Sequence, residues 1–380
     1  MHDFLIKEII TNNIDKELIY TGFDKGYAHQ ASNKYVYKNL KIFNLSVPQA
    51  NILKQTALSV GADCATHREV ITGKIEQSNC ILGGSLSQIK KIAEKLQFQP
   101  FGLKILGQKL QEQCKPSPTQ NKTKIVGILN ITKDSFSDGG KYYTYEAAIK
   151  QLDKLIKEGA DIIDIGAEST KPYSSEISPE MQLEKLLPVL EYIQNEKLNI
   201  PISIDTRSSV VAEKCIEAGA NIINDVSGLT HDDKMADVLA KYPNIKLIIQ
   251  HTKGTPENMQ NEPSYENLMD EIFVYLYNRV NFAISKGIDK NNIIIDPGIG
   301  FGKLKPHNIE ILKRWQELKS IGCPIMIGIS RKSMLECPNA SNEEKDIYTL
   351  ALNSILISQG VDYIRVHNPA IHKKLISIWE

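Results

Sequence analysis

Short apolar runs alternate with longer amphipathic segments along the last two thirds of the chain. Eight such runs occur, at residues 125–131, 162–165, 202–204, 222–224, 247–249, 293–295, 325–329 and 363–366. They are rich in isoleucine and valine without polar alternation, which is typical of parallel strands covered on both faces. Helical segments lie between them, for example at 145–158, 179–195 and 265–286. Because residues 124–380 approach the ~250 residues of a TIM (β/α)8 barrel, the pattern predicts that fold; a doubly wound open sheet is the alternative.

The first 115 residues have a different pattern. It predicts strands at 34–37, 40–45, 80–82 and 102–106, and helices at 46–60 and from residue 87 onward. We therefore expect a small α/β domain over residues 1–115, to which we assign no chemistry. Gly83-Gly84-Ser85 has the composition of a phosphate-binding turn, although a tight turn without a ligand is the simpler interpretation. Residues 116–123 are polar and contain two prolines, so we interpret them as a linker to the barrel at 124–380.

Polar and charged side chains follow every predicted strand of the barrel. In this fold the carboxyl ends of the strands meet at one face, where active sites are built. Asp205, Asn224 and Asp296 form an acceptor-rich group suited to a flat heterocycle with N–H donors. The cations among these residues, suited to a phosphate or diphosphate, are Lys332, Arg365 and His367. Each residue taken singly has a simpler interpretation as a helix cap or a surface charge.

Composition narrows the classes of partner. Lysine plus arginine balance aspartate plus glutamate at 45 each, and the sequence pI is about 7.1. This balance argues against a nucleic-acid surface or an anionic membrane as the partner, and favours small-molecule substrates. No apolar run approaches the ~20 residues needed to cross a bilayer, so we expect a cytoplasmic protein. The six cysteines form no CxxC pair, which favours reduced structural thiols over a zinc site.

Seven motifs, in this order and spacing, resemble those of the dihydropteroate synthases: GILNITKDSFSDGG, GADIIDIGAEST, SIDT, GANIINDVSG, DPGIGFGK, IGISRKS and RVH. The resemblance covers about residues 124–380. It implies a barrel transferase of folate synthesis that condenses hydroxymethyl-dihydropterin diphosphate with p-aminobenzoate, giving dihydropteroate and pyrophosphate. It further implies Mg²⁺ as the cofactor and a homodimer as the assembled state.

The resemblance also assigns roles to residues by motif. Asn130 is expected to contribute to Mg²⁺ and diphosphate binding. The pterin would be held by Asp205, Asn224, Asp296 and Lys332, and the diphosphate by Arg365 and His367. The expected p-aminobenzoate site comprises Phe136, Asp138, Ser169, Thr170, Pro172 and Ser333. Phe301 and Gly328 complete the substrate-binding set, and the expected catalytic residues are Lys332, Asp138 and Arg365.

The implied chemistry agrees with the side chains present. A diphosphate on a benzylic-type carbon can leave when cations neutralise the charge that grows on the bridging oxygen, while the electron-rich pterin supports the carbocation. The arylamine then attacks that carbon. No strong general base is required, which fits a sequence without a recognisable serine-histidine-carboxylate or cysteine-histidine arrangement.

Five residues depart from the family pattern. Lys133 replaces a usual proline, Lys171-Pro172-Tyr173 replaces arginine, proline and glycine, and Asn368 replaces an aspartate. Thr252 follows His251 where methionine is frequent, and this change removes an apolar contact that a pterin ring would otherwise make. None of the departures removes a proposed pterin or diphosphate ligand, so we interpret them as tuning.

Two other functions remain open at the level of the sequence. A methyl-tetrahydrofolate-binding methyltransferase domain has the same barrel and pterin pocket, but no diphosphate to bind and no need for the SRK and RVH groups. A catalytically silent pterin-binding protein would be expected to lose loop residues such as Asp138 or Ser169, and both are present.

Overall fold

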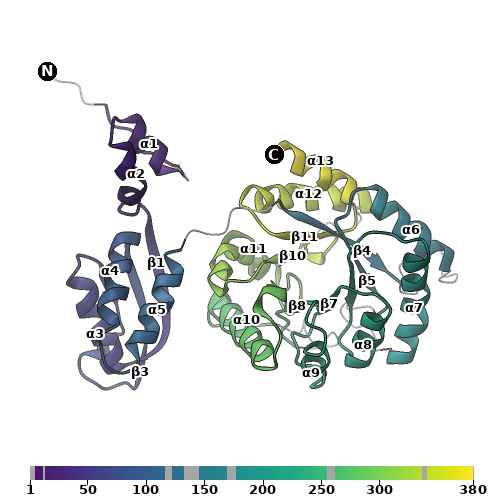
Figure 1. The fold of residues 1–380 in the computed structure, drawn as a ribbon, viewed down its shortest axis with the longest axis horizontal. Coiled ribbons are helices and arrows are strands. Elements are labelled where there is room, and N and C mark those ends of the chain that lie inside the picture. The colour runs from purple at the N-terminus through teal and green to yellow at the C-terminus, as the bar shows by residue number, and fades with distance from the viewer. Residues whose placement is uncertain are drawn as a thin grey trace. The chain divides into compact units, whose positions relative to one another are not determined.

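The chain forms two compact units, Met1–Pro118 and Thr119–Glu380. The computed structural model describes residues 5–11, 13–115, 122–131, 145–168, 177–254, 262–335 and 340–379. In Figure 1 the first unit runs from purple to blue and the second from teal to yellow. The predicted linker at 116–123 contains the boundary between the units, and most of it lies outside the described residues.

The first unit is built on an antiparallel sheet of order β1-β3-β2. Its strands are β1 (Tyr37–Ser46), β2 (Asp63–Ala65) and β3 (Gln77–Ser85), and its helices are α1 (Ile14–Tyr20), α2 (Lys25–Ser32), α3 (Val47–Leu58), η1 (Arg68–Val70), α4 (Leu86–Leu96) and α5 (Leu103–Gln113). Helix α4 buries Ile89, Ile92 and Leu96 at helical spacing, in one core with Leu53 of α3 and Leu82 of β3. The predicted small α/β fold is therefore present in this unit.

Three local predictions for the first unit are wrong. Of the predicted strand at 34–37, only Tyr37 lies in β1, because Lys34 and Tyr35 form the turn that follows α2. Residues 102–106 begin helix α5 and not a strand, because Leu103, Gly107 and Leu110 are buried at a spacing of four and three residues. Gly83-Gly84-Ser85 is neither a tight turn nor a phosphate loop. These residues end strand β3, and Ser85 forms a capping box with Gln88 at the start of α4.

The second unit is a nearly closed barrel of eight parallel strands. They are β4 (Lys124–Asn130), β5 (Ile162–Gly166), β6 (Ile202–Asp205), β7 (Ile222–Asp225), β8 (Lys246–Gln250), β9 (Ile293–Asp296), β10 (Met326–Ile327) and β11 (Tyr363–Val366). Hydrogen bonding follows the order β10-β11-β4-β5-β6-β7-β8-β9. A parallel bridge between Ile295 and Ile325 brings the two edges together. This confirms the predicted TIM barrel, with every predicted run forming a strand.

Helices surround the strands as an outer layer (Figure 1). They are α6 (Tyr145–Lys157), α7 (Pro179–Asn195), α8 (Ser209–Glu217), α9 (Met235–Leu239), α10 (Leu268–Ser285), η2 (Lys290–Asn292), α11 (Lys305–Arg314), η3 (Trp315–Ile321), η4 (Ser333–Leu335), α12 (Asn342–Ser358) and α13 (Pro369–Trp379). One core lies between helices and strands, and fully buried Trp315 is its largest side chain. Among the described residues, no helix is long and apolar enough to cross a membrane.

A separate ring of inward-facing side chains fills the amino-terminal half of the barrel interior. It consists of Val126, Ile162, Ile222, Ile248, Ile294, Met326 and Tyr363. Such layers make the interior of a TIM barrel a packed core and not a pore. The ring therefore separates the two ends of the barrel, and a site at one end has no path through the interior to the other.

A shortened chain tests whether the barrel folds by itself. We expect a protein that begins at Thr119 to be soluble and to unfold in one cooperative transition, because this unit holds its own core. Circular dichroism during heating measures this. Insolubility of the shortened protein beside a well-behaved full chain would show that the first unit supports the barrel.

Candidate active site

A buried ionic network occupies the carboxyl end of the barrel interior. At its centre is Asp164 of β5, a residue that we did not single out in the sequence. Its carboxylate accepts hydrogen bonds from Ser203 Oγ at 2.5 Å, Arg365 Nε at 2.6 Å and Asn224 Nδ2 at 3.2 Å. A charged residue inside an apolar strand was the available signal, because a buried carboxylate requires such partners.

Arg365 connects this carboxylate to a second one. Its Nη2 donates to Asp205 Oδ2 at 3.0 Å, so one guanidinium bridges Asp164 and Asp205. Burial alone would lower the pKa of Arg365, but the two carboxylates outweigh burial and raise that pKa. Arg365 therefore remains charged, and it has a structural partner in addition to the diphosphate role expected from its motif. Its Nη1 has no hydrogen-bond partner among the described residues.

Burial raises the pKa of Asp205 to about 7, although the charge of Arg365 opposes this rise and the nearby Asp164 adds to it. A carboxylate whose pKa is raised on folding stabilises the protein most below its unfolded pKa of about 3.9. That contribution is lost as the pH rises toward 7. We therefore expect the wild-type free energy of unfolding, relative to that of Asp205→Asn, to decline between pH 4 and 7, as denaturant titrations at several pH values would measure. A difference that stays constant over this range would contradict the raised pKa.

Asn224 lies beside Asp205 in the strand register and presents an unsatisfied oxygen. Its Nδ2 is used by Asp164, whereas its buried Oδ1 accepts no hydrogen bond within the described part of the chain. A buried carbonyl oxygen without a donor costs about 1–3 kcal/mol unless a ligand or water supplies one. The free acceptor of Asn224 thus fits a ligand with N–H donors.

Asn130 and Asp205 flank Gly166, the last residue of β5. A methyl group added to Gly166 would lie 3.5 Å from Asn130 Oδ1 and 3.8 Å from Asp205 Oδ2, so both side chains lie close to the end of β5. Among the described residues, no group of three or more His, Cys, Asp or Glu could hold a metal ion. The donor set nevertheless fits Mg²⁺ bound with a diphosphate, because Mg²⁺ usually takes few protein oxygens and completes its shell with phosphate oxygens and water.

Asp296 and Lys332 face each other across the loop that follows β9. Asp296 is buried and its Oδ1 accepts a 2.6 Å hydrogen bond from the Gly298 N–H. Burial lowers the pKa of Lys332 to about 8, and the charge of Asp296 opposes this change. The Lys332 ammonium donates to Ile299 O and lies 4.6 Å from the centre of the Phe301 ring. The structure thus brings three of the predicted substrate residues together.

Lys303 also contacts the loop that follows β9. Its buried ammonium lies 2.8 Å from His251 Nδ1 and donates to the carbonyl oxygens of His251, Gly298 and Phe301. Burial shifts the pKa of Lys303 well below its usual value, with the Asp296 carboxylate opposing. Burial lowers the pKa of His251 as well, so its ring is neutral. Lys303 connects the end of β8 to the loop that carries Phe301.

The substitution Lys303→Met should lower the free energy of unfolding by about 1–2 kcal/mol, because it leaves the four acceptors without their shared donor. Chemical denaturation measures this loss. Lys313→Met, on the exposed side of α11, is the matched control and should change little. Equal small losses for the two variants would show that the Lys303 contacts contribute nothing to stability.

The loops after β10 and β11 meet through Ser330 and His367. Ser330 Oγ lies 2.9 Å from His367 Nδ1 and accepts from the His367 N–H at 3.2 Å. Arg331, at a positive φ of 57°, pairs with Asp346 of α12 through two 2.8 Å hydrogen bonds. Gly328 lies close to Arg365, since a methyl group there would be 3.4 Å from Arg365 Cβ. These contacts place Lys332 and His367 on one side of the barrel mouth.

The remaining predicted residues divide into two groups. Ser333 is exposed at the start of η4, and the structure shows no contact between it and the buried network. The predicted residues that lie outside the described part of the chain are Phe136, Asp138, Ser169, Thr170 and Pro172, together with the departures at Lys133, Lys171 and Tyr173.

The two described departures have local explanations. Thr252 donates a 2.6 Å hydrogen bond to the Val226 carbonyl and accepts one from Gln250 at 3.1 Å, which a methionine would not make. Asn368 Nδ2 donates to Asp346 Oδ2 at 3.4 Å, where an aspartate would place a second negative charge. Both residues thus serve contacts within the barrel.

Comparison with known proteins gives consistent matches. Residues 126–367 match the family model described as pterin binding enzyme. A dihydropteroate synthase of Clostridium beijerinckii is 42% identical over 249 residues, which cover 65% of this chain and 89% of that protein. A solved dihydropteroate synthase of Xanthomonas albilineans, in complex with 7,8-dihydropteroate, is 31% identical with a TM-score of 0.61, covering 69% of this chain and 94% of that one.

A longer relative extends the match beyond the barrel. A probable bifunctional folylpolyglutamate synthase/dihydropteroate synthase of Haloferax volcanii is 32% identical over 343 residues. This match covers 84% of the present chain, more than the barrel unit holds, so part of the first unit also has a counterpart there. The chain spans only 40% of the length of that relative.

Proposed function

We propose that this chain, which belongs to the dihydropteroate synthase family of pterin-binding enzymes, is a transferase that makes dihydropteroate in folate synthesis. The proposed substrates are 6-hydroxymethyl-7,8-dihydropterin diphosphate and p-aminobenzoate, with pyrophosphate as the leaving group. The proposed state in the cell is a cytoplasmic homodimer that requires Mg²⁺. We assign no chemical role to the first unit.

The observation that carries the proposal is the unsatisfied acceptor group at the carboxyl end of the barrel. Asn224 Oδ1 is buried without a donor, and it lies beside the Asp205 carboxylate. Asp296 uses Oδ1 for the Gly298 N–H, and its second oxygen has no hydrogen-bond partner among the described residues. A pterin edge, with adjacent ring N–H and amino donors, supplies hydrogen bonds to such a set.

The cations of the site support departure of the diphosphate. Arg365 uses Nε and Nη2 for Asp164 and Asp205, and its Nη1 remains available to a ligand. Lys332 comes from the loop that follows β10. Both groups reduce the cost of negative charge on the bridging oxygen as its bond to the methylene carbon breaks. Mg²⁺, when bound through the diphosphate and Asn130 Oδ1, would supply further charge neutralisation.

After the diphosphate leaves, the amine of p-aminobenzoate attacks the methylene carbon, and the proton that the nitrogen then loses passes to water or to the released diphosphate. The protein needs mainly to orient the amine and to exclude water, because the amine is neutral at physiological pH. The Lys332 ammonium lies 4.6 Å from the centre of the Phe301 ring, and this contact holds the ammonium near Asp296. A flat pterin ring is electron-rich and stabilises positive charge at the attached carbon.

A methyltransferase domain that binds methyl-tetrahydrofolate is the second candidate, because it needs the same pterin pocket. The diphosphate distinguishes the two functions. We expect calorimetric titration to show that pterin diphosphate with Mg²⁺ binds at least about tenfold more tightly than the bare pterin, since the added charge meets Lys332 and Arg365. Tighter binding of methyl-tetrahydrofolate, with no gain from the diphosphate, would favour the methyltransferase.

A further inference from the structure

The amino-terminal end of the barrel holds a cavity of about 820 Å³. Its lining includes the first residues of six strands, so it lies at the end of the barrel opposite the candidate active site: Lys124, Ile162, Ile202, Ile222, Lys246 and Tyr363. The volume is within the ~300–1,000 Å³ typical of small-molecule pockets. Because the apolar ring of the barrel interior closes its inner side, the cavity is a separate compartment.

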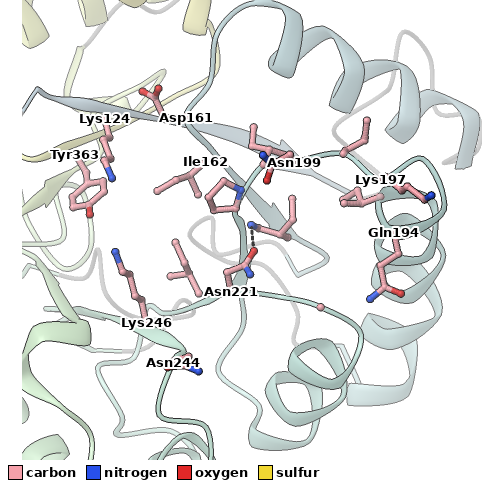
Figure 2. A pocket seen from close by; sticks show the side chains of 17 residues that line it. Lys124, Asp161, Ile162, Gln194, Lys197, Asn199, Asn221, Asn244, Lys246 and Tyr363 are labelled. Atoms are coloured by element: carbon pink, nitrogen blue, oxygen red, sulfur yellow. Dashed lines mark hydrogen bonds between the residues drawn. The ribbon is translucent and has the colours of Figure 1, made fainter.

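Two lysines enter this cavity from opposite walls. Val126 and Ile248 belong to the inward-facing ring. Lys124 and Lys246 each lie two residues before one of them, and alternate residues of a strand point to the same face, so both lysine side chains leave the backbone toward the barrel axis. Strands β4 and β8 are four apart in the order of an eight-stranded barrel and therefore oppose each other. Figure 2 shows the two ammonium groups pointing toward each other.

The charge of the two lysines is not balanced by the protein. Within the part of the chain that the structure describes, no hydrogen bond or ion pair engages either ammonium group. Asp161 is the carboxylate in the lining, and its oxygens are already engaged: Oδ2 accepts from the Ile125 N–H at 2.8 Å, and Oδ1 lies 3.5 Å from Lys373 Nζ. Lys124 is exposed and Lys246 is half-buried, so water screens only part of the repulsion between the two ammonium groups, and an anion between them would offset the remainder.

Further hydrogen-bond donors line the same space. Tyr363 is the register partner of Lys124, and its hydroxyl makes no hydrogen bond with any described residue. Figure 2 shows this hydroxyl on the side of the cavity where the two ammonium groups point. Asn221 uses Oδ1 to accept from the Ile202 N–H at 2.8 Å, which leaves its Nδ2 as a donor. The lining thus offers hydrogen-bond donors and positive charge, while its carboxylate, Asp161, already has partners in the protein.

We propose that this cavity binds a small, multiply charged oxyanion of the phosphate class, held between Lys124 and Lys246 with Tyr363 and Asn221 as further donors. Lysine ammonium groups act as compact point charges toward phosphate oxygens, and such charge-assisted hydrogen bonds are about twice as strong as neutral ones. The site is independent of the proposed synthase chemistry, because it lies behind the apolar ring.

Inorganic pyrophosphate is the probe, and calorimetric titration of the full-length protein is the measurement. The variant Lys124→Met/Lys246→Met should bind one equivalent of pyrophosphate fewer than wild type, or bind it at least about tenfold more weakly. Lys150→Met/Lys374→Met, on the exposed surfaces of α6 and α13, removes the same charge and should behave as wild type. Any pyrophosphate site shared by all three proteins does not depend on Lys124 and Lys246 and is counted apart from this cavity.

Equal stoichiometry and equal affinity in the three proteins would overturn the proposal. Thermal unfolding followed by circular dichroism confirms that each variant is folded. Tyr363→Phe provides a second test that leaves both lysines in place, and it should weaken pyrophosphate binding at this site by a few fold through loss of one hydrogen bond. Dihydropteroate formation should be unchanged in the lysine variant, because neither lysine contacts the candidate active site.

Discussion

Replacing Arg365 by alanine is expected to lower the free energy of unfolding by about 3–5 kcal/mol at neutral pH. The guanidinium bridges Asp164 and Asp205, and its removal leaves two buried carboxylates without a counter-charge. Acid should reduce the loss, because burial raises the pKa of Asp205 to about 7 and its protonation removes one of the uncompensated charges. Denaturant titrations of wild type and variant at pH 5 and pH 7.5 measure both effects.

Arg331→Ala provides the matched comparison, since Arg331 also makes a two-bond ion pair, with Asp346, but its side chain is more exposed than that of Arg365. We expect a smaller loss with Arg331→Ala, and less dependence on pH. If Arg365→Ala costs no more than Arg331→Ala, the buried network does not stabilise the barrel. In that case the only role left for Arg365 would be the one implied by its motif, binding the diphosphate.

The substitution Asp296→Asn is expected to weaken pterin binding by about 1–3 kcal/mol, or roughly 5- to 150-fold. The asparagine keeps an oxygen for the Gly298 N–H, so the turn after β9 remains capped. The other carboxylate oxygen becomes an NH₂ group, which would face the N–H donors of the pterin and the ammonium of Lys332. Calorimetric titration with the bare pterin gives the affinity, and thermal unfolding gives the stability.

Asp289→Asn is a suitable control, because Asp289 also caps a backbone turn, at Asn291 N–H, but on an exposed surface. This control should leave pterin affinity unchanged. The comparison of affinity with stability distinguishes the two possible roles of Asp296, which are binding the pterin and capping the turn after β9. Unchanged affinity with a lower melting temperature would make Asp296 a turn cap, and the pterin site would have to lie elsewhere.

The barrel was predictable because its strands leave a strong pattern. Runs such as 293–295 are continuous isoleucine, which is typical of a strand buried on both faces, and each of the eight runs forms a strand. The first unit was less predictable. The short run at residues 102–106 predicts a strand, whereas burial of Gly107 against α4 and of Leu110 one turn later continues the apolar pattern at helical spacing.

The candidate site was only partly predictable. Residues at strand ends, such as Asp205, Asn224 and Asp296, are apparent once the strands are placed. Asp164 is not apparent from the sequence because it lies within a strand. Its position in the sequence does not show whether the side chain faces the barrel interior or the surrounding helices. Lys303 was missed for a related reason: its role depends on His251, which is distant in sequence and adjacent in space.

The most direct test of the account is to incubate the purified full-length protein with 6-hydroxymethyl-7,8-dihydropterin diphosphate, p-aminobenzoate and Mg²⁺, and to quantify both products over time. We expect one dihydropteroate for each pyrophosphate released, with release dependent on p-aminobenzoate. Lys332→Met should slow both products equally, because one ammonium group serves the single bond-breaking step. Pyrophosphate release without dihydropteroate, or no turnover by a protein that binds the pterin, would contradict the assignment as a synthase.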